Sequence, residues 1–128
     1  MSLTIANEMR KAALDGMLAL LNSGQFRLTS AANGGGSELA NLTFGGTAFG
    51  ASTTANPSVA TSNAITADSS VTPGTVLGFD LRTSGGVSRI NGTVGVGSGD
   101  FQVSDNVIPG AATVVSCDAG LQLSLTLG

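Results

Sequence analysis

The sequence has no histidine, no tryptophan and no tyrosine, and among its 128 residues it has one cysteine and one lysine. Without histidine, the usual general base beside a nucleophile is missing. A Ser-Lys dyad would need a buried lysine, and Lys11 is expected on the polar side of a helix. We therefore expect that the chain is not an enzyme.

Charge is also scarce, because only 10% of the residues are charged and the net charge is −3, whereas about 25% is typical. The basic residues are scattered at Arg10, Lys11, Arg27, Arg82 and Arg89, so no basic stripe is available for nucleic acid. A surface of Ser, Thr, Asn, Gly and Ala loses little ion hydration when another protein covers it. The composition indicates a protein that works by packing against partner proteins.

The first apolar stretch is interrupted by Glu8, Arg10, Lys11 and Asp15, which predicts that it is not a secretory signal. No run approaches the ~18 apolar residues of a transmembrane helix, so we expect no membrane association. Cys117 cannot form an intrachain disulfide, which favours a reducing compartment. We interpret it as a small apolar residue in a strand.

One pair of carboxylates and one glycine-rich run are candidate chemical sites. Asp100 and Asp105 follow Gly and Ser, and we interpret them as turn-forming. A calcium site with Asn106 is the alternative, although the dense ligand spacing of a calcium loop is missing. The run GTVGVGSGD lacks the Lys-Ser/Thr and the helix of a phosphate loop. We expect no catalytic residue, no metal and no cofactor.

Residues 4–22 are predicted to form a helix, since they are rich in helix formers and repeat apolar residues at helical spacing. Thr4 is the expected N-cap, and Gly24 is the expected left-handed residue after the helix. Gly16 either allows close approach of another backbone or is a tolerated surface glycine. The apolar arc is broad, so the helix packs on its own sheet or on a partner as well.

Beyond Gly24, short apolar-polar alternations replace the helical pattern. Strands are predicted at 25–30, 38–44, 58–65, 75–83, 87–94, 100–103, 113–117 and 121–127. Ser84-Gly85-Gly86 is typical of a hairpin turn. Arg82 and Arg89 flank this turn, and three interpretations stay open for them: a pair with Asp80 across strands, a solvated face, or a contact with a partner's carboxylate. Residues 45–75 are expected to be an ordered loop system that also forms an arm on a partner.

These patterns predict a mainly β fold with a single domain. Residues 1–24 form an N-terminal α-helix, and residues 25–128 form a β-sandwich or jelly-roll-like domain of about eight short strands. Six side chains are candidate partner contacts, taken from the helix, the 45–75 segment and the presumed hairpin: Arg10, Met17, Phe49, Pro57, Arg82 and Arg89.

The order of segments resembles a family of short tailed-bacteriophage virion proteins. The resemblance covers nearly the whole chain and lies in LALLNSGQFRL, LANLTFGGTAFG, ATSNAITADSSVTPGTVLGFDLRTSGG, RINGTVGVGSGDFQVS and the closing Ser/Thr/Leu strand. It departs from the family at FRLTSAANGGG, where many members have a Tyr-Ser-Gly type strand ending. Such proteins are similar to capsid decoration, or cement, proteins.

The resemblance implies a virion protein, made in the host cytoplasm, that binds the outer capsid surface and bridges capsomers. The implied partners are the major capsid protein and further copies of this chain, as a dimer or trimer. Two alternatives stay open. One is a protein associated with a phage tail or fibre, and the other is a small carbohydrate-binding module, against which the missing Trp and Tyr count.

Overall fold

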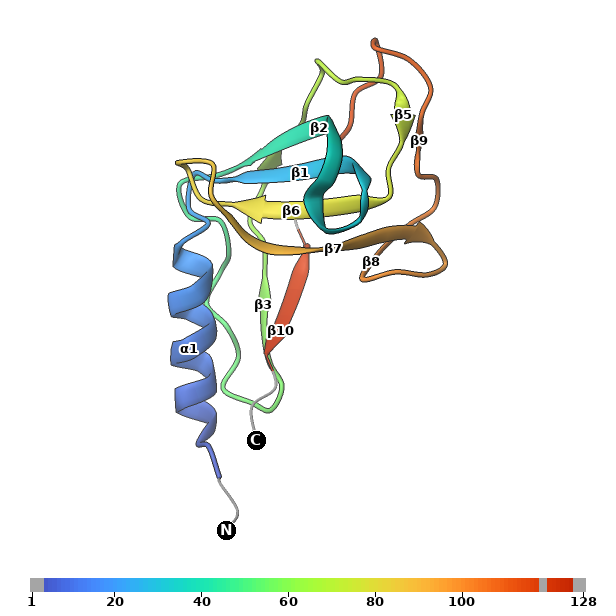
Figure 1. Ribbon diagram of the computed structural model, residues 1–128. Helices are drawn as coiled ribbons and strands as arrows, with labels where there is room; N and C mark the ends of the chain where they lie inside the picture. Colours follow the sequence, from blue (N-terminus) through green and yellow to red (C-terminus); the bar gives the residue numbers. More distant parts are fainter. Residues whose placement is uncertain (1–3, 118–119, 126–128) are drawn as a thin grey trace.

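The computed structural model describes residues 4–117 and 120–125. It confirms a mainly β chain in which one N-terminal helix precedes a curled multi-stranded sheet (Figure 1). The elements are α1 (Asn7–Ala19), β1 (Gln25–Ala31), η1 (Ala32–Gly34), β2 (Gly35–Phe44), β3 (Ser58–Thr61), β4 (Ile65–Thr66), β5 (Gly74–Thr75), β6 (Gly78–Arg82), β7 (Ser88–Val96), β8 (Phe101–Val103), β9 (Val107–Ile108) and β10 (Gln122–Leu125).

The main sheet has six strands in the order β4-β2-β1-β6-β7-β8. Its pairs are antiparallel except β7 with β8, which is parallel. Two further antiparallel pairs, β10–β3 and β5–β9, lie outside this sheet. The β3–β10 pair runs crosswise to the main strands and packs beside α1 (Figure 1).

Several predicted strands differ from the observed ones. Segment 58–65 divides into β3 and β4, which pair with different strands, and 75–83 divides into β5 and β6. Segment 113–117 is not a strand and makes one bridge, from Val115 to Asp68. β9 was not predicted. Residues 126–127 of the last predicted strand lie outside the described residues, and Leu121, Leu123 and Leu125 face the core, as the alternation predicts.

The turns carry glycine where the backbone requires it. Gly86 has a φ of 82° and closes the predicted β6–β7 hairpin through its N–H to the carbonyl of Thr83. Residues 97–100 fold back to start β8 parallel to β7. A side chain on Gly92 would lie 2.7 Å from Oδ2 of Asp100. The glycine-rich run therefore consists of strand and turn glycines, as predicted.

All five phenylalanines form one continuous cluster in the core. Phe26 is the centre, with ring centroids 6.3 Å from Phe44, 6.2 Å from Phe79 and 5.5 Å from Phe101. Phe49 extends the cluster from Phe44 at 5.6 Å. Because Phe49 belongs to the segment after β2 and Phe101 belongs to β8, the cluster ties distant parts of the chain together.

The helix is shorter than predicted. Its N-cap is Ala6, which makes no side-chain capping bond, so the expected cap at Thr4 is wrong. Ser23 takes the left-handed conformation expected of Gly24, with a φ of 56°. Gly24 is needed for another reason, since a Cβ there would collide with the carbonyl oxygen of Arg82. Gly16 has open space around it, which favours its interpretation as a surface glycine.

Within the described residues, no helix is long and apolar enough to cross a membrane.

Candidate interaction surface

The inner face of α1 packs on β3 and is fully buried. Leu14, Leu18 and Leu21 are at most 3% exposed, and they recur at the helical spacing seen in the sequence. Arg10 lies on the same face and is 5% exposed, with Nη1 donating to Oδ1 of Asn7 at 2.7 Å. This face therefore belongs to the core of the chain itself.

A polar contact fixes the segment after β2 along one side of α1. The backbone N–H of Ser52 donates to Oδ1 of Asp15 at 2.8 Å, while Lys11 Nζ lies 2.8 Å from Oδ2 of the same carboxylate. Hydrogen bonding from Lys11, and then from Ser52, lowers the pKa of Asp15 to about 2. The side chain of Asn22 accepts from the N–H of Ala48 at 2.9 Å. Residues 45–52 are thus ordered on this chain, as expected of the loop system.

The outer face of α1 is apolar and exposed. Met9 is 64% exposed, Met17 is 47% exposed and Leu20 is 53% exposed. Ala12 and Gly16 are exposed on the same side. The remaining charges of the helix fall on one strip that holds Glu8, Lys11 and Asp15. A helix with apolar side chains on two sides is normally covered on both, so this face is the strongest candidate surface for a partner.

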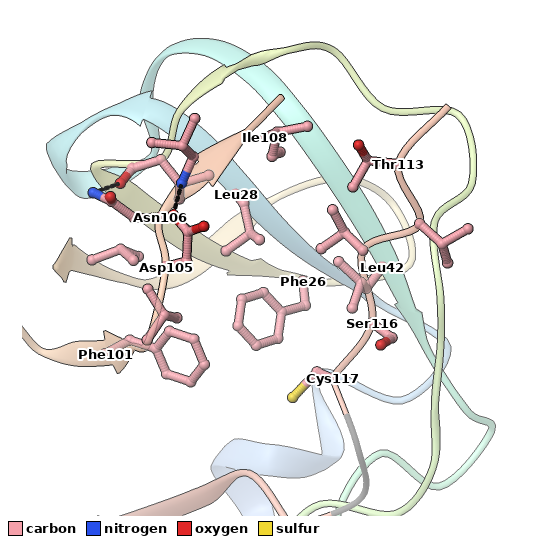
Figure 2. Close-up of a pocket in the computed structure, with 16 residues that line it drawn as sticks. Phe26, Leu28, Leu42, Phe101, Asp105, Asn106, Ile108, Thr113, Ser116 and Cys117 are labelled. Atoms are coloured by element: carbon pink, nitrogen blue, oxygen red, sulfur yellow. Dashed lines mark hydrogen bonds between the residues drawn. The ribbon is translucent and has the colours of Figure 1, made fainter. Parts of the chain in front are cut away.

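A cavity of about 330 Å³ opens beneath the segment that follows β8. Figure 2 shows Phe26, Leu28 and Leu42 of β1 and β2, with Phe101, Ile108 and Cys117 arranged around them. Val107 and Val114 also line it and are 50% and 61% exposed, which places apolar surface at its rim. The cavity lies among the rings of the core cluster, away from α1.

A group of charges centred on a buried aspartate joins β1, β2 and β6. Asp80 has a side chain 3% exposed, with Oδ2 at 2.8 Å from Nε of Arg82 and Oδ1 at 3.4 Å from Nε of Arg27. Arg27 Nε also lies 3.6 Å from Glu38 Oε1. Of the alternatives left open for Arg82, the structure shows the pair with Asp80, which runs along one strand rather than across two. The burial of Asp80 makes this a structural tie, not a surface site.

The six candidate contacts lie in different environments. Met17, Pro57 and Arg89 are exposed, so their role as partner contacts stays a prediction. Arg10 and Phe49 are 5% and 7% exposed, and both side chains serve the core of this chain. Arg82 is half-buried against Asp80. The structure does not gather the six into one patch, because they come from α1, the 45–57 segment and the β6–β7 hairpin.

The carboxylates that follow β7 accept hydrogen bonds that hold backbone turns. Oδ2 of Asp100 accepts hydrogen bonds from the N–H and the hydroxyl of Thr93, at 3.0 and 3.1 Å. Oδ1 of Asp105 accepts from the N–H of Val107 at 3.0 Å, and the Asn106 amide donates to the Val76 carbonyl at 3.1 Å. Across residues 4–117 and 120–125, no three His, Cys, Asp or Glu side chains are grouped as metal ligands.

Two features escaped the sequence interpretation. Met9 carries a signal, because it continues the line of Ala13, Gly16 and Leu20 at helical spacing. The cavity has no signal in the sequence, since it depends on how residues 104–117 lie over the sheet. Cys117 lines it and does not belong to a strand.

In comparisons with known proteins, no family model, curated protein or solved structure matches the chain.

Proposed function

We propose that the chain is a structural subunit that binds a partner protein through the outer face of α1. The observation that carries this proposal is the exposure of Met9, Met17 and Leu20 on a helix whose other apolar face is already buried. The exposed Ala12 and Gly16 lie beside them and add little bulk to this face. The absence of charge on this face means that docking desolvates no ion there.

The energy of one such contact is modest. Full burial of a Met or Leu side chain contributes about 1.5–3 kcal/mol. The three side chains are each about half exposed, so covering them contributes roughly 1 kcal/mol apiece. A single contact of this strength is weak, whereas many identical contacts on a symmetric particle act together. The surface therefore suits a subunit that is used in many copies.

In its finer form, we propose that the partner is a phage capsid and that the chain decorates the capsid's outer surface, where it bridges capsomers. Support comes from the order of segments along the chain and from the low proportion of charged residues. The partners are then the major capsid protein and neighbouring copies of this chain. A contact of standard size, roughly 1,600 Å², would extend beyond α1 to the exposed 53–57 segment.

Purified particles that carry the chain test this proposal. A decoration protein is expected at a copy number equal to that of the major capsid protein or a simple fraction of it. Tens of copies or fewer would instead indicate a tail component, and absence from particles would contradict both assignments.

A variant separates the α1 surface from the rest of the chain. Leu20→Asp adds a charge to the outer face, and we expect it to reduce binding to undecorated shells at least tenfold. Thr72→Asp adds the same charge at an exposed position just before β5, a strand that lies far from α1 (Figure 1), and serves as the matched control. Equal binding by the two variants would exclude the outer face of α1 as the contact.

A further inference from the structure

The cavity beneath residues 104–117 is larger than the packing faults of an ordinary core. Its volume is about 330 Å³, whereas a cavity of about 150 Å³ with apolar walls is enough to bind benzene. Figure 2 shows Phe26 and Leu28 near the middle of the lining, with Phe101 and Cys117 to either side of Phe26. The space therefore matches a molecule of about two fused rings.

The chemistry of the walls selects against polar and charged occupants. The side chains of Asp105 and Asn106 already bond to the backbone of Val107 and Val76, so these bonds hold the segment in place. The rest of the wall is mainly Phe, Leu, Val and Ile. Water in such a space finds few partners, and an apolar group gains affinity by displacing it.

We propose that this cavity is a binding site for a small, uncharged, apolar molecule the size of indole or naphthalene. The site is separate from the outer face of α1 and does not depend on the proposed role in an assembly. Entry takes place past the exposed side chains of Val107 and Val114 at the rim. For a ligand of about nine non-hydrogen atoms, the dissociation constant is about 0.1–1 mM.

Indole is the probe of choice, because the chain has no Trp and no Tyr to mask its fluorescence. Titration of the full chain into indole is expected to shift the indole emission to shorter wavelength, with saturation. At about ten times the dissociation constant, indole is expected to raise Tm by roughly 3–6 °C. Equimolar benzoate, which carries a charge, is expected to leave Tm unchanged.

Cys117 supplies a second readout in the unaltered protein, since its side chain lines the cavity (Figure 2). Saturating indole is expected to slow its modification by a thiol reagent such as dithionitrobenzoate at least threefold. If indole changes neither Tm nor this rate, the proposal is wrong.

A filling variant locates the binding. Leu28→Trp places the larger ring in the cavity and is expected to weaken the effect of indole on Tm at least fivefold. Leu20→Trp, the same substitution on the exposed face of α1, should respond like the parent. If Leu28→Trp binds indole as the parent does, the probe lies elsewhere and the assignment of this cavity fails. If Leu28→Trp does not fold, the protection of Cys117 from the thiol reagent by indole, measured on the unaltered protein, decides whether the cavity binds indole.

Discussion

Removal of the charge on Asp80 tests the buried tie between β1, β2 and β6. Asp80→Asn keeps the shape of the side chain but leaves Arg27 and Arg82 facing a neutral group at 3.4 and 2.8 Å. Breaking a buried ion pair costs about 3–5 kcal/mol. The side chain of Arg82 is 25% exposed, and Arg27 keeps Glu38 at 3.6 Å. We therefore expect a smaller loss in the free energy of unfolding, about 2–3 kcal/mol.

The assay is urea unfolding followed by far-ultraviolet circular dichroism, since the chain lacks tryptophan and tyrosine. With an m-value of about 1.5 kcal/mol/M, the midpoint should fall by about 1.5–2 M. Asp105→Asn is the matched control, because Asp105 is exposed and its amide replacement still accepts from Val107. We expect less than about 0.5 kcal/mol for this control. Equal midpoints for the two variants would refute the tie.

Two further predictions concern α1 and the glycine-rich run. Because the pKa of Asp15 is lowered to about 2, its contribution is complete above the ordinary value near 4 and is lost as pH falls through about 2. Its side chain is 36% exposed, so solvent screening limits this to about 1 kcal/mol, and Asp15→Asn should flatten acid unfolding curves between pH 4 and 2 by about that amount. In urea unfolding, Gly92→Ala should lower the free energy of unfolding by about 1–3 kcal/mol, since its Cβ would meet Asp100. Gly16→Ala, in open space on α1, should raise it by up to about 1 kcal/mol. The reverse order would contradict the tight packing at Gly92 and the open surroundings of Gly16.

Local patterns predicted the elements whose partners lie nearby. β1, β6 and β7 pair with neighbours across short turns, and the alternation in their sequences was sufficient to find them. The inner face of α1 also followed from spacing alone. Its N-terminus did not, because no capping side chain fixes it and Ala6 takes that position.

Some elements that depend on distant contacts could not be predicted. Segment 113–117 has strand-forming residues, yet it makes one bridge, to Asp68, because a ladder needs a partner that the local sequence does not specify. β9 exists because β5, more than 30 residues earlier, lies beside it. The cavity depends on the same long-range placement. The outer face of α1 can be recognised from the sequence, because its apolar residues recur at helical spacing within one local segment.

An electron cryo-microscopy map of particles that carry the chain tests the central claim most directly. We expect protein density from a neighbouring subunit to cover Met9, Met17 and Leu20 on the outer face of α1, at each copy on the shell. A map in which these three side chains face solvent, while other parts of the chain make the contact, would contradict it.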